Sequence, residues 1–465
     1  MKVQDSPVIK NLDELLSHGN VEGKKAALEI IEYTLMRLDS YNIVKGLMAL
    51  HNDELKIGDV SFDLSRINDI YVIGAGKSTL RIAEALEEVL KDRIKGGVII
   101  EKYGAGKQLS RIEVIEAGHP IPDEKGLEGA EKIVQIARSA KENDLVFVAI
   151  TGGCSALMCL PAKGIPFQDK QRVNELLLKC GATIDEINTV RKHISSVKGG
   201  RLALLIHPAH IINLIVIDEV AGKPWGPTIP DTTTFRDAEL VLKRYDLWDK
   251  VPESVRRHIS EANPKMETPK IDHFRKIGIK SHTFILADNK AACEIAYEKA
   301  KKLGFNSTIL STVIEGESKD VGIVLAAIAK EACDHGRPLN PPCALICGGE
   351  TTVTIRGEAG EGGRNQELVL SASLKISGKK EIVIASVGTD GTDGPTDIAG
   401  GIIDGSTLER AEKTGINVTE ELKRHNSSYV LKKLGDAIMT GPTGTNVMDL
   451  QVIIVTSRKE NINHK

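Results

Sequence analysis

Short apolar runs alternate with longer segments of helical periodicity through most of this 465-residue chain. Strands buried on both faces have this pattern, and the segments between them supply the crossover helices of a parallel sheet. We therefore predict an α/β fold with a mostly parallel sheet and helices on both faces. The predicted strands cover residues 70–73, 97–100, 145–150, 211–217, 283–286, 344–347, 381–385 and 451–455.

The same pattern predicts how the chain divides. Residues 1 to about 65 have helical periodicity, clearest over residues 26–35, and are expected to form a helical scaffold. Residues 261–270 are polar and contain two prolines, which favours a connection between domains. Because 465 residues exceed a single compact core, we predict one domain over residues 1–262 and a second over residues 263–465.

Composition and charge narrow the range of functions. A net charge of −3 provides no global basic field for nucleic acid. The sequence has no run of about 18 apolar residues that could span a bilayer and opens without an apolar signal region, so we expect a cytoplasmic location. The seven cysteines form no C-x-x-C pair, which predicts reduced, mostly buried thiols. The expected partners are small molecules, with no nucleic acid and no membrane.

A glycine-rich loop, GGETTVTIRGEAGEGGRNQE at residues 348–367, follows the strand predicted at residues 344–347. Glycines there let a ligand approach backbone N–H groups. Gly362 and Gly363 precede Arg364, Asn365 and a segment of helical periodicity, so they are predicted to stand at a helix N-terminus. An arginine at such a terminus suits an anionic ligand. The alternative is a loop that binds nothing.

A second glycine loop, IGAGKST at residues 73–79, follows the first predicted strand. It lacks the first glycine of a P-loop, where Tyr71 stands, and the third glycine of a dinucleotide fingerprint, where Thr79 stands. The loop is still expected to bring backbone N–H groups, a helix N-terminus and a mobile lysine to an anion. The alternative is a structural turn with an exposed lysine. The candidate residues are Gly74, Gly76, Lys77 and Ser78.

Further polar loops follow other predicted strands, where a doubly wound sheet places its ligands. Residues 116–123 form a proline-stiffened loop, and residues 151–155 are expected to form an anion nest rather than a nucleophilic elbow. Residues 188–201 carry five basic side chains, which either bind an anion or cover a solvated helix face. The candidate binding residues are His119, Gly152, Gly153, Ser155, Arg191 and Lys198.

Residues 386–397 place three aspartates among glycines and threonines after a predicted strand. Oxygen-rich loops without sulfur or histidine suit Mg²⁺, with Asp390 and Asp393 as the expected ligands. A series of Asx-turns is the alternative. The last glycine and hydroxyl loop, residues 440–449, adds Thr445 and Asn446 as candidate phosphate-binding residues.

Eight sequence blocks occur in the order GAGKS, EAGHPIPDEKG, TGGCSAL, RKHISSVKGGRLA, GGETTVTIRG, GEGGRNQE, GTDGTDGPTDIAG and TGPTGTN. Together they resemble the MOFRL-type glycerate kinases, the glycerate 2-kinase family, over roughly residues 20–455. The resemblance implies a Rossmann-like N-terminal domain, a smaller MOFRL-type C-terminal α/β domain and an active site in the cleft between them. It also implies phosphorylation of D-glycerate to 2-phosphoglycerate by ATP with Mg²⁺ or another divalent cation.

By motif, Lys77 and Arg364 match the family's proposed catalytic positions. They are expected to neutralise the transferring phosphoryl group from opposite domains, which close over the substrate, while Arg191 and Lys198 bind the glycerate carboxylate. The loop DEVAGKPWGP after residue 217 departs from the family pattern, so its ligand role stays open. The candidate oligomeric state of the chain is a homodimer. The candidates for the base that takes the hydroxyl proton are His119, Asp218 and Asp390.

Two other functions stay open from the sequence. An NAD(P)H-dependent hydroxypyruvate reductase needs an acidic ribose-binding residue roughly twenty positions past the glycines, and Asp92 and Glu101 are near enough. A non-enzymatic phosphosugar-binding module is the second, because a strand followed by GAGKS also resembles sugar-isomerase-type modules. The glycine loops of the second half of the chain count against this module.

Overall fold

The computed structural model describes residues 7–220 and 222–457 and divides into two compact units. The unit that contains Lys77 comprises Ser40–Ile217 and Lys223–Leu286, and we call it the Lys77 unit. The Arg364 unit comprises Met1–Asp39, Asp218–Gly222 and Ala287–Lys465. This division differs from the predicted boundary at residues 262/263, because the chain leaves the Lys77 unit for the last time at the end of β9 (Ser281–Ala287).

A six-stranded sheet in the order β6-β5-β4-β7-β8-β9 forms the centre of the Lys77 unit. Strand β4 (Ile70–Ala75) pairs in parallel with β5 (Ile94–Lys102) and with β7 (Leu145–Ile150). The pairs of β5 with β6 (Ile112–Ala117) and of β7 with β8 (His210–Val216) are parallel too, which confirms the predicted sheet. The strand order changes direction between β4 and β7, where open α/β sheets bind ligands.

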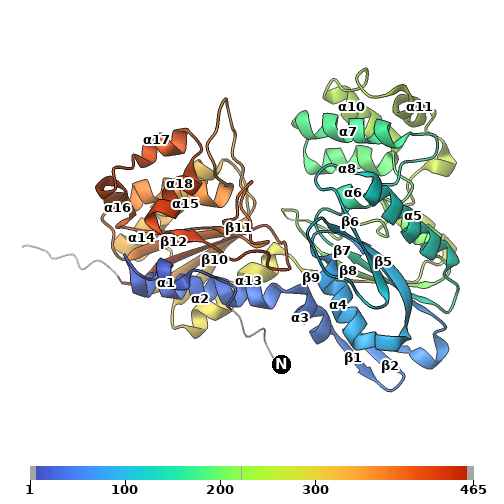
Figure 1. Cartoon of the computed structure of the whole chain (residues 1–465), viewed down its shortest axis with the longest axis horizontal. Coiled ribbons are helices and arrows are strands. Elements are labelled where there is room, and N and C mark those ends of the chain that lie inside the picture. The colour runs from blue at the N-terminus through green and yellow to red at the C-terminus, as the bar shows by residue number, and fades with distance from the viewer. Residues whose placement is uncertain (1–6, 221, 458–465) are drawn as a thin grey trace, which may run out of the picture. The chain divides into compact units, whose positions relative to one another are not determined.

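Most helices of the Lys77 unit belong to one of two apolar cores. One core packs α5, α6 and α9 against the sheet, and the other joins α7, α8, α10 and α11 into a helical cluster (Figure 1). Short 3-10 turns occur at Leu64–Arg66, Lys91–Arg93 and Pro264–Met266. The helices are α3 (Ser40–Leu47), α4 (Thr79–Leu90), α5 (Glu124–Ser139), α6 (Cys154–Leu157), α7 (Phe167–Lys179), α8 (Ile184–His193), α9 (Arg201–Ile206), α10 (Phe235–Arg244), α11 (Glu253–Glu261) and α12 (Ile271–Ile277).

Residues 48–63 correct the prediction of a helical scaffold up to about residue 65. They form three antiparallel strands, β1 (Met48–His51), β2 (Glu54–Ile57) and β3 (Val60–Asp63). Tight turns connect them, with positive φ at Asn52 and Gly58, as two-residue hairpins require. Each of these strands is too short for its alternation of apolar and polar residues to stand out from the helical pattern that precedes it.

The Arg364 unit has a mixed sheet in the order β10-β11-β15-β12-β13-β14. Strands β10 (Asn306–Ile314) and β11 (Cys343–Gly349) are parallel, whereas β15 (Asp449–Val455) is antiparallel to β11 and to β12 (Ile382–Gly388). The C-terminal ends of β11 and β12 therefore meet the N-terminal end of β15 at one edge of the sheet. Strands β13 (Gly400–Asp404) and β14 (Ala437–Ile438) complete the sheet.

Helices cover both faces of this mixed sheet, as predicted. Helices α2 and α13 share one apolar core with the sheet, and α14 and α15 share another on alternate residues of the same strands. A small core joins α15 to the last helices. The helices are α1 (Leu12–Leu15), α2 (Val21–Leu38), α13 (Asn289–Lys302), α14 (Ser318–His335), α15 (Arg364–Ile376), α16 (Thr407–Lys413), α17 (Val418–Lys423) and α18 (Ser427–Leu434).

Helix α2 explains why the N-terminal segment belongs to the Arg364 unit. Its apolar residue Ile31 packs in the same core as Ile454 of β15, and Figure 1 shows the helix beside this sheet. Lys24 on α2 is fully buried, and its Nζ lies 2.8 Å from Oδ1 of Asp436. An amphipathic pattern alone does not show which sheet a helix will cover.

The cysteines agree with the sequence prediction. All seven are free thiols, and six of them are buried. Within the described ranges, the chain contains no helix that is both long enough and apolar enough to cross a membrane.

Candidate active site

The loop with Lys77 lies at the switch point of the parallel sheet, beside the loop that follows β7. The backbone N–H of Lys77 donates to the carbonyl of Gly152 over 2.8 Å, and the N–H of Ser78 donates to Oγ1 of Thr151 over 3.1 Å. Gly76 has a φ of +143°, and a Cβ there would lie 2.1 Å from Thr151 Oγ1. Glycine is therefore required at position 76 for the two loops to approach.

A third loop brings His119 to the same place. A Cβ on Gly153, which has a φ of +86°, would lie 2.9 Å from Cδ2 of His119 and 3.2 Å from Cγ of Lys77. Burial, together with the positive charges of Lys77, Lys102 and Arg191, lowers the pKa of His119 to about 4. The imidazole is therefore neutral at pH 7. Ser155 follows in α6 and is partly buried.

The basic residues predicted at 188–201 do not form a solvated helix face. Lys198 is 7% exposed, and burial lowers its pKa. Arg191 at the end of α8 donates from Nε to Oδ1 of Asn174 over 3.1 Å, and burial lowers its pKa too. In the parts of the chain that the structure describes, no carboxylate forms an ion pair with either side chain. The structure therefore gathers uncompensated positive charge near the Lys77 loop.

The loop from Asp218 to Asp231 contributes a different pattern. Asp231 is 5% exposed, and its Oδ1 lies 2.5 Å from Nζ of Lys192. Lys192 is thus neutralised, unlike its neighbours Arg191 and Lys198. Ala221 in this loop lies outside the described residues.

Glu101 occupies the N-terminus of α4, where a dinucleotide would place its pyrophosphate. Its Oε2 accepts from the N–H of Leu80 over 3.0 Å, its Oε1 accepts from the N–H of Lys102, and the side chain is 4% exposed. Asp92, in the turn before β5, lies at the opposite end of that strand. Neither carboxylate can serve a ribose as a reductase would need, so the geometry counts against dinucleotide binding.

Burial raises the pKa of Glu101 to about 7, which gives a test of this buried carboxylate. Because the folded pKa exceeds the unfolded value, the folded state loses stability as pH rises from about 4.5 to about 7. Glu101→Gln removes this contribution. We expect the variant's stability relative to wild type to increase by about 3 kcal/mol between pH 4.5 and pH 8. Urea denaturation at both pH values measures it, and an unchanged difference would contradict this pKa.

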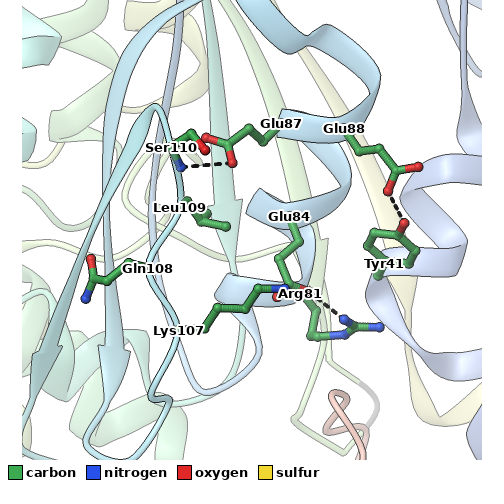
Figure 2. Close-up of a pocket in the computed structure, with 9 residues that line it drawn as sticks. All are labelled: Tyr41, Arg81, Glu84, Glu87, Glu88, Lys107, Gln108, Leu109 and Ser110. Atoms are coloured by element: carbon green, nitrogen blue, oxygen red, sulfur yellow. Dashed lines mark hydrogen bonds and ion pairs between the residues drawn. The ribbon is translucent and has the colours of Figure 1, made fainter.

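A surface pocket of about 450 Å³ lies elsewhere on the Lys77 unit, between α3, α4 and the loop before β6 (Figure 2). Its charges are paired inside the protein. Glu84 lies 2.5 Å from Arg81 and 2.7 Å from Lys107, and Glu87 accepts from the N–H of Ser110. The pocket therefore lacks the uncompensated charge found around Arg191 and Lys198.

Arg364 begins α15 as predicted, but its guanidinium is already bound by carboxylates. Nε and Nη2 contact the two oxygens of Asp449 over 2.7 and 2.9 Å, and Nη1 lies 2.7 Å from Glu350. Asp449 is fully buried, whereas the side chains of Arg364 and Glu350 are 31% and 39% exposed. The arginine is thus held by a two-point contact on its buried side and by a displaceable carboxylate on its exposed side.

Asp393 caps the N-terminus of α15. Its two oxygens accept from the backbone N–H groups of Asn365 and Gln366 over 3.1 and 2.9 Å. A Cβ on Gly363 would lie 2.3 Å from Cγ of Asp393, which explains the glycine. Burial and the charge of Asp449 raise the pKa of Asp393 to about 6. The sequence did not predict this capping role.

The remaining candidate residues lie in neighbouring loops of the Arg364 unit. Asp390 Oδ1 accepts from the N–H and hydroxyl of Thr392 over 3.0 Å, which is the Asx-turn alternative. The N–H of Thr443 donates to the Asp390 carbonyl, so residues 440–446 lie beside this loop. Thr445 Oγ1 is buried without a hydrogen-bond partner among the described residues, and Asn446 accepts from the N–H of Met448. Gly362 packs against Ser427.

These carboxylates differ in their fit to a divalent cation. Asp393 fits poorly as a direct ligand, because both its oxygens already accept backbone N–H groups. Asp390 is partly exposed at the end of β12 and fits better. Counting only the described ranges, no group of three or more His, Cys, Asp or Glu side chains is arranged to hold a metal ion. The metal role of Asp390 and Asp393 stays a prediction.

Comparisons with known proteins agree with this architecture. The chain matches a domain of unknown function, DUF4147, over residues 26–260 and the MOFRL family over residues 343–449. It is 44% identical to a glycerate 2-kinase of Pyrococcus horikoshii, over 94% of this chain and 98% of that protein. It is 38% identical to a D-glycerate 2-kinase of Thermotoga maritima, over 93% of this chain and 98% of that protein.

A solved structure extends the likeness to three dimensions. The crystal structure of a glycerate kinase from Thermotoga maritima superposes with a TM-score of 0.81 at 37% identity, over 93% of this chain and 99% of that one. The fold and its two ligand-type loop clusters define a two-unit α/β protein with a Rossmann-type sheet. Within this class, the chain belongs to the MOFRL-type glycerate kinase family.

Sequence reasoning missed three functional neighbours of the predicted residues. Asp449 and Glu350 hold Arg364, and Lys170 is buried where the positive charge of Arg191 acts on it. Glu350 directly follows the glycine pair that ends β11, which was an available signal. Asp449 ends the predicted loop at residues 440–449 but was not singled out in it, and the sequence around Lys170 gave no sign that this lysine is buried. Lys77 and Arg364 lie in different units, as predicted, whereas a cleft between domains and its closure stay predictions.

Proposed function

We propose that this protein is a glycerate 2-kinase that transfers the γ-phosphoryl group of ATP to the 2-hydroxyl of D-glycerate. The observation that carries the proposal is the uncompensated positive charge of Arg191 and Lys198 beside the Lys77 loop. A small carboxylate is the ligand that such a site at a sheet switch point suits. The names of the relatives support glycerate as that carboxylate.

In this proposal, the Lys77 unit binds the acceptor. Arg191 offers a guanidinium to the glycerate carboxylate, and Lys198 adds a second charge. His119 is neutral at pH 7, so it can accept the proton of the attacking hydroxyl through a hydrogen bond. Asp218 and Asp390 stay alternative bases.

Phosphoryl transfer depends on positioned positive charge more than on covalent chemistry. Lys77 is proposed to contact the transferring group from one unit and Arg364 from the other. Asp449 fixes the plane of the guanidinium, so that a phosphate oxygen can replace Glu350 at Nη1 without reorienting the arginine. Asp390 is the residue proposed to hold a divalent cation, which would supply further neutralisation of the ATP phosphates.

Replacing Asp390 by asparagine tests that last role. We expect Asp390→Asn to leave the fold intact and to weaken the dependence on Mg²⁺, because an amide keeps the shape but loses the negative charge. Activity is measured against Mg²⁺ concentration. Asp397→Asn is the matched control, since Asp397 lies in the same loop and pairs only on the surface with Lys432 over 2.9 Å. Equal Mg²⁺ curves for both variants and wild type would assign Asp390 to its Asx-turn.

One assay separates the candidate functions. Purified protein is incubated with D-glycerate, ATP and Mg²⁺ while ADP is followed, and in parallel with hydroxypyruvate and NADH or NADPH while the reduced cofactor is followed. We expect ADP to form only when D-glycerate is present. Consumption of the reduced cofactor without ADP formation would establish the reductase. If neither reaction occurs, the result would favour a binding module. The cytoplasmic location and the homodimer stay predictions.

A further inference from the structure

Asn365 lies in the first turn of α15, between two buried carboxylates. Its Nδ2 donates to Oδ1 of Asp449 over 2.9 Å and to Oδ1 of Asp393 over 3.1 Å. Its Oδ1 accepts from the hydroxyl of Ser386 on β12 over 2.5 Å, and the residue is 1% exposed. An amide has two N–H donors and one oxygen. Both donors and the oxygen of Asn365 are therefore engaged inside the Arg364 unit.

The chemistry of these neighbours fixes the orientation of the amide. An ionised carboxylate only accepts hydrogen bonds, so the NH₂ group must face Asp449 and Asp393. The hydroxyl of Ser386 has a proton to donate, so it faces the amide oxygen. A rotation of the amide by half a turn would set its oxygen against two carboxylates, which is unfavourable. Asn365 thus holds the two carboxylates in one fixed arrangement.

Asp449 connects Asn365 to Arg364. Its Oδ1 accepts from Nη2 of Arg364 as well as from Nδ2 of Asn365, and its Oδ2 accepts from Nε of Arg364. A two-point contact fixes the geometry of the guanidinium relative to the carboxylate, but the two groups can still rotate together about their side-chain torsions. The hydrogen bond from Asn365, which is itself held by Ser386, opposes this joint rotation.

We propose that Asn365 is a positioning residue for Arg364, which acts through Asp449 and does not itself contact the phosphates. The inference rests on the proposed function, in which Arg364 meets the transferring phosphoryl group. As a phosphate ligand, Asn365 would have to give up one of its buried contacts. As a positioning residue, it keeps them all and supplies the preorganisation on which phosphoryl transfer depends.

The variant Asn365→Leu tests this role, because leucine keeps a branched side chain of similar size and removes the three hydrogen bonds. We expect kcat per folded molecule to fall about tenfold at an unchanged KM for D-glycerate. Steady-state kinetics measures both, and circular dichroism gives the folded fraction, so that a loss of stability alone does not alter the result. An unchanged kcat would overturn the proposal. A raised KM for ATP at unchanged kcat would overturn it too, since it would indicate a direct phosphate contact.

Combining this change with Arg364→Lys decides whether Asn365 acts through the arginine. Effects of residues in one hydrogen-bond network are not additive. In the Arg364→Lys background, where the two-point contact is already lost, Asn365→Leu should lower kcat by less than about twofold. A further loss of about tenfold would show that Asn365 acts independently of Arg364, and the proposal would be wrong.

Gln366→Met is the matched control, because Gln366 is a fully buried amide in the same helical turn. Its Nε2 donates to Oγ1 of Thr396 over 3.1 Å and to the carbonyl of Asp393, and its Oε1 accepts from Oγ of Ser428 over 2.6 Å. Methionine keeps the length and removes these hydrogen bonds. The variant should lose stability but keep the wild-type kcat per folded molecule. An equal fall in kcat would reduce the effect of Asn365→Leu to general destabilisation.

Ser386→Ala keeps the proposal testable if Asn365→Leu does not fold. It removes only the hydroxyl that orients the amide, so kcat should fall by about threefold, as for the loss of one hydrogen bond. The fall should disappear in the Arg364→Lys background. A wild-type kcat in the folded Ser386→Ala variant would contradict the positioning role.

This inference and the proposed function fail in different ways. If the wild-type protein phosphorylates D-glycerate and both Asn365→Leu and Ser386→Ala keep its kcat, only the positioning role is wrong. If the wild-type protein forms no ADP from D-glycerate and ATP, the proposed function is wrong and the inference falls with it. A loss of kcat that depends on Arg364 supports both.

Discussion

Replacing Arg364 by lysine is expected to lower kcat by about 10²-fold, in line with the loss of one preorganised donor. The guanidinium contacts both oxygens of Asp449 and still presents Nη1 outward. A lysine has one compact charge, so it cannot hold two oxygens and a phosphate in the same fixed geometry. Steady-state kinetics of Arg364→Lys, with circular dichroism to confirm folding, measures the effect. The KM for D-glycerate should change little.

Arg356→Lys is the matched control, because Arg356 is an exposed arginine in the same glycine-rich loop. It should keep wild-type kcat. A raised KM for D-glycerate at unchanged kcat in Arg364→Lys would move Arg364 from the phosphoryl group to the substrate carboxylate. Wild-type values of both constants would give the whole loop a structural role only.

The second large effect is expected from Asp449→Asn. Removing the charge of the fully buried Asp449 leaves Arg364 with the partly exposed Glu350 as its carboxylate partner, which costs about 3 kcal/mol of unfolding free energy. The variant also loses the two-point contact that orients Arg364, so kcat should fall together with stability. Denaturant unfolding and kinetics on the same preparation measure both.

Asp334→Asn provides the comparison for this variant. Asp334 forms an ion pair with Lys379 at 2.5 Å in the same unit, but the two side chains are 30% and 20% exposed. A partly solvated pair contributes about 1 kcal/mol or less. An equal loss of stability in the two variants would show that Asp449 and Arg364 are not a coupled buried pair.

Much of the fold follows from the sequence because its signals are local. Each of the eight predicted apolar runs became a strand, and glycine loops stand at the strand ends where they were expected. Gly76 and Gly363 have a physical requirement for glycine, since a Cβ at either would collide with a neighbouring side chain. Because such close approaches require glycine, a glycine in the sequence can indicate them.

The rest depends on partners that are distant in the chain. Arg364 contacts Asp449 across 85 positions, and no local pattern pairs them. Helix α2 has an apolar stripe, but only the packing shows that the stripe faces the sheet of the Arg364 unit. The direction of β15 is likewise set by its neighbours β11 and β12 and not by its own composition. These features explain why the predicted boundary at residues 262/263 differs from the observed division and why the mixed sheet was not predicted.

Product analysis by phosphorus nuclear magnetic resonance tests the central claim most directly. The purified protein is supplied with D-glycerate, ATP and Mg²⁺, and the new phosphate ester is identified as ADP accumulates. We expect 2-phosphoglycerate to appear in equal amount with ADP, and neither to appear when D-glycerate is omitted. Formation of 3-phosphoglycerate, or of ADP with inorganic phosphate alone, would contradict the proposed phosphorylation of the 2-hydroxyl.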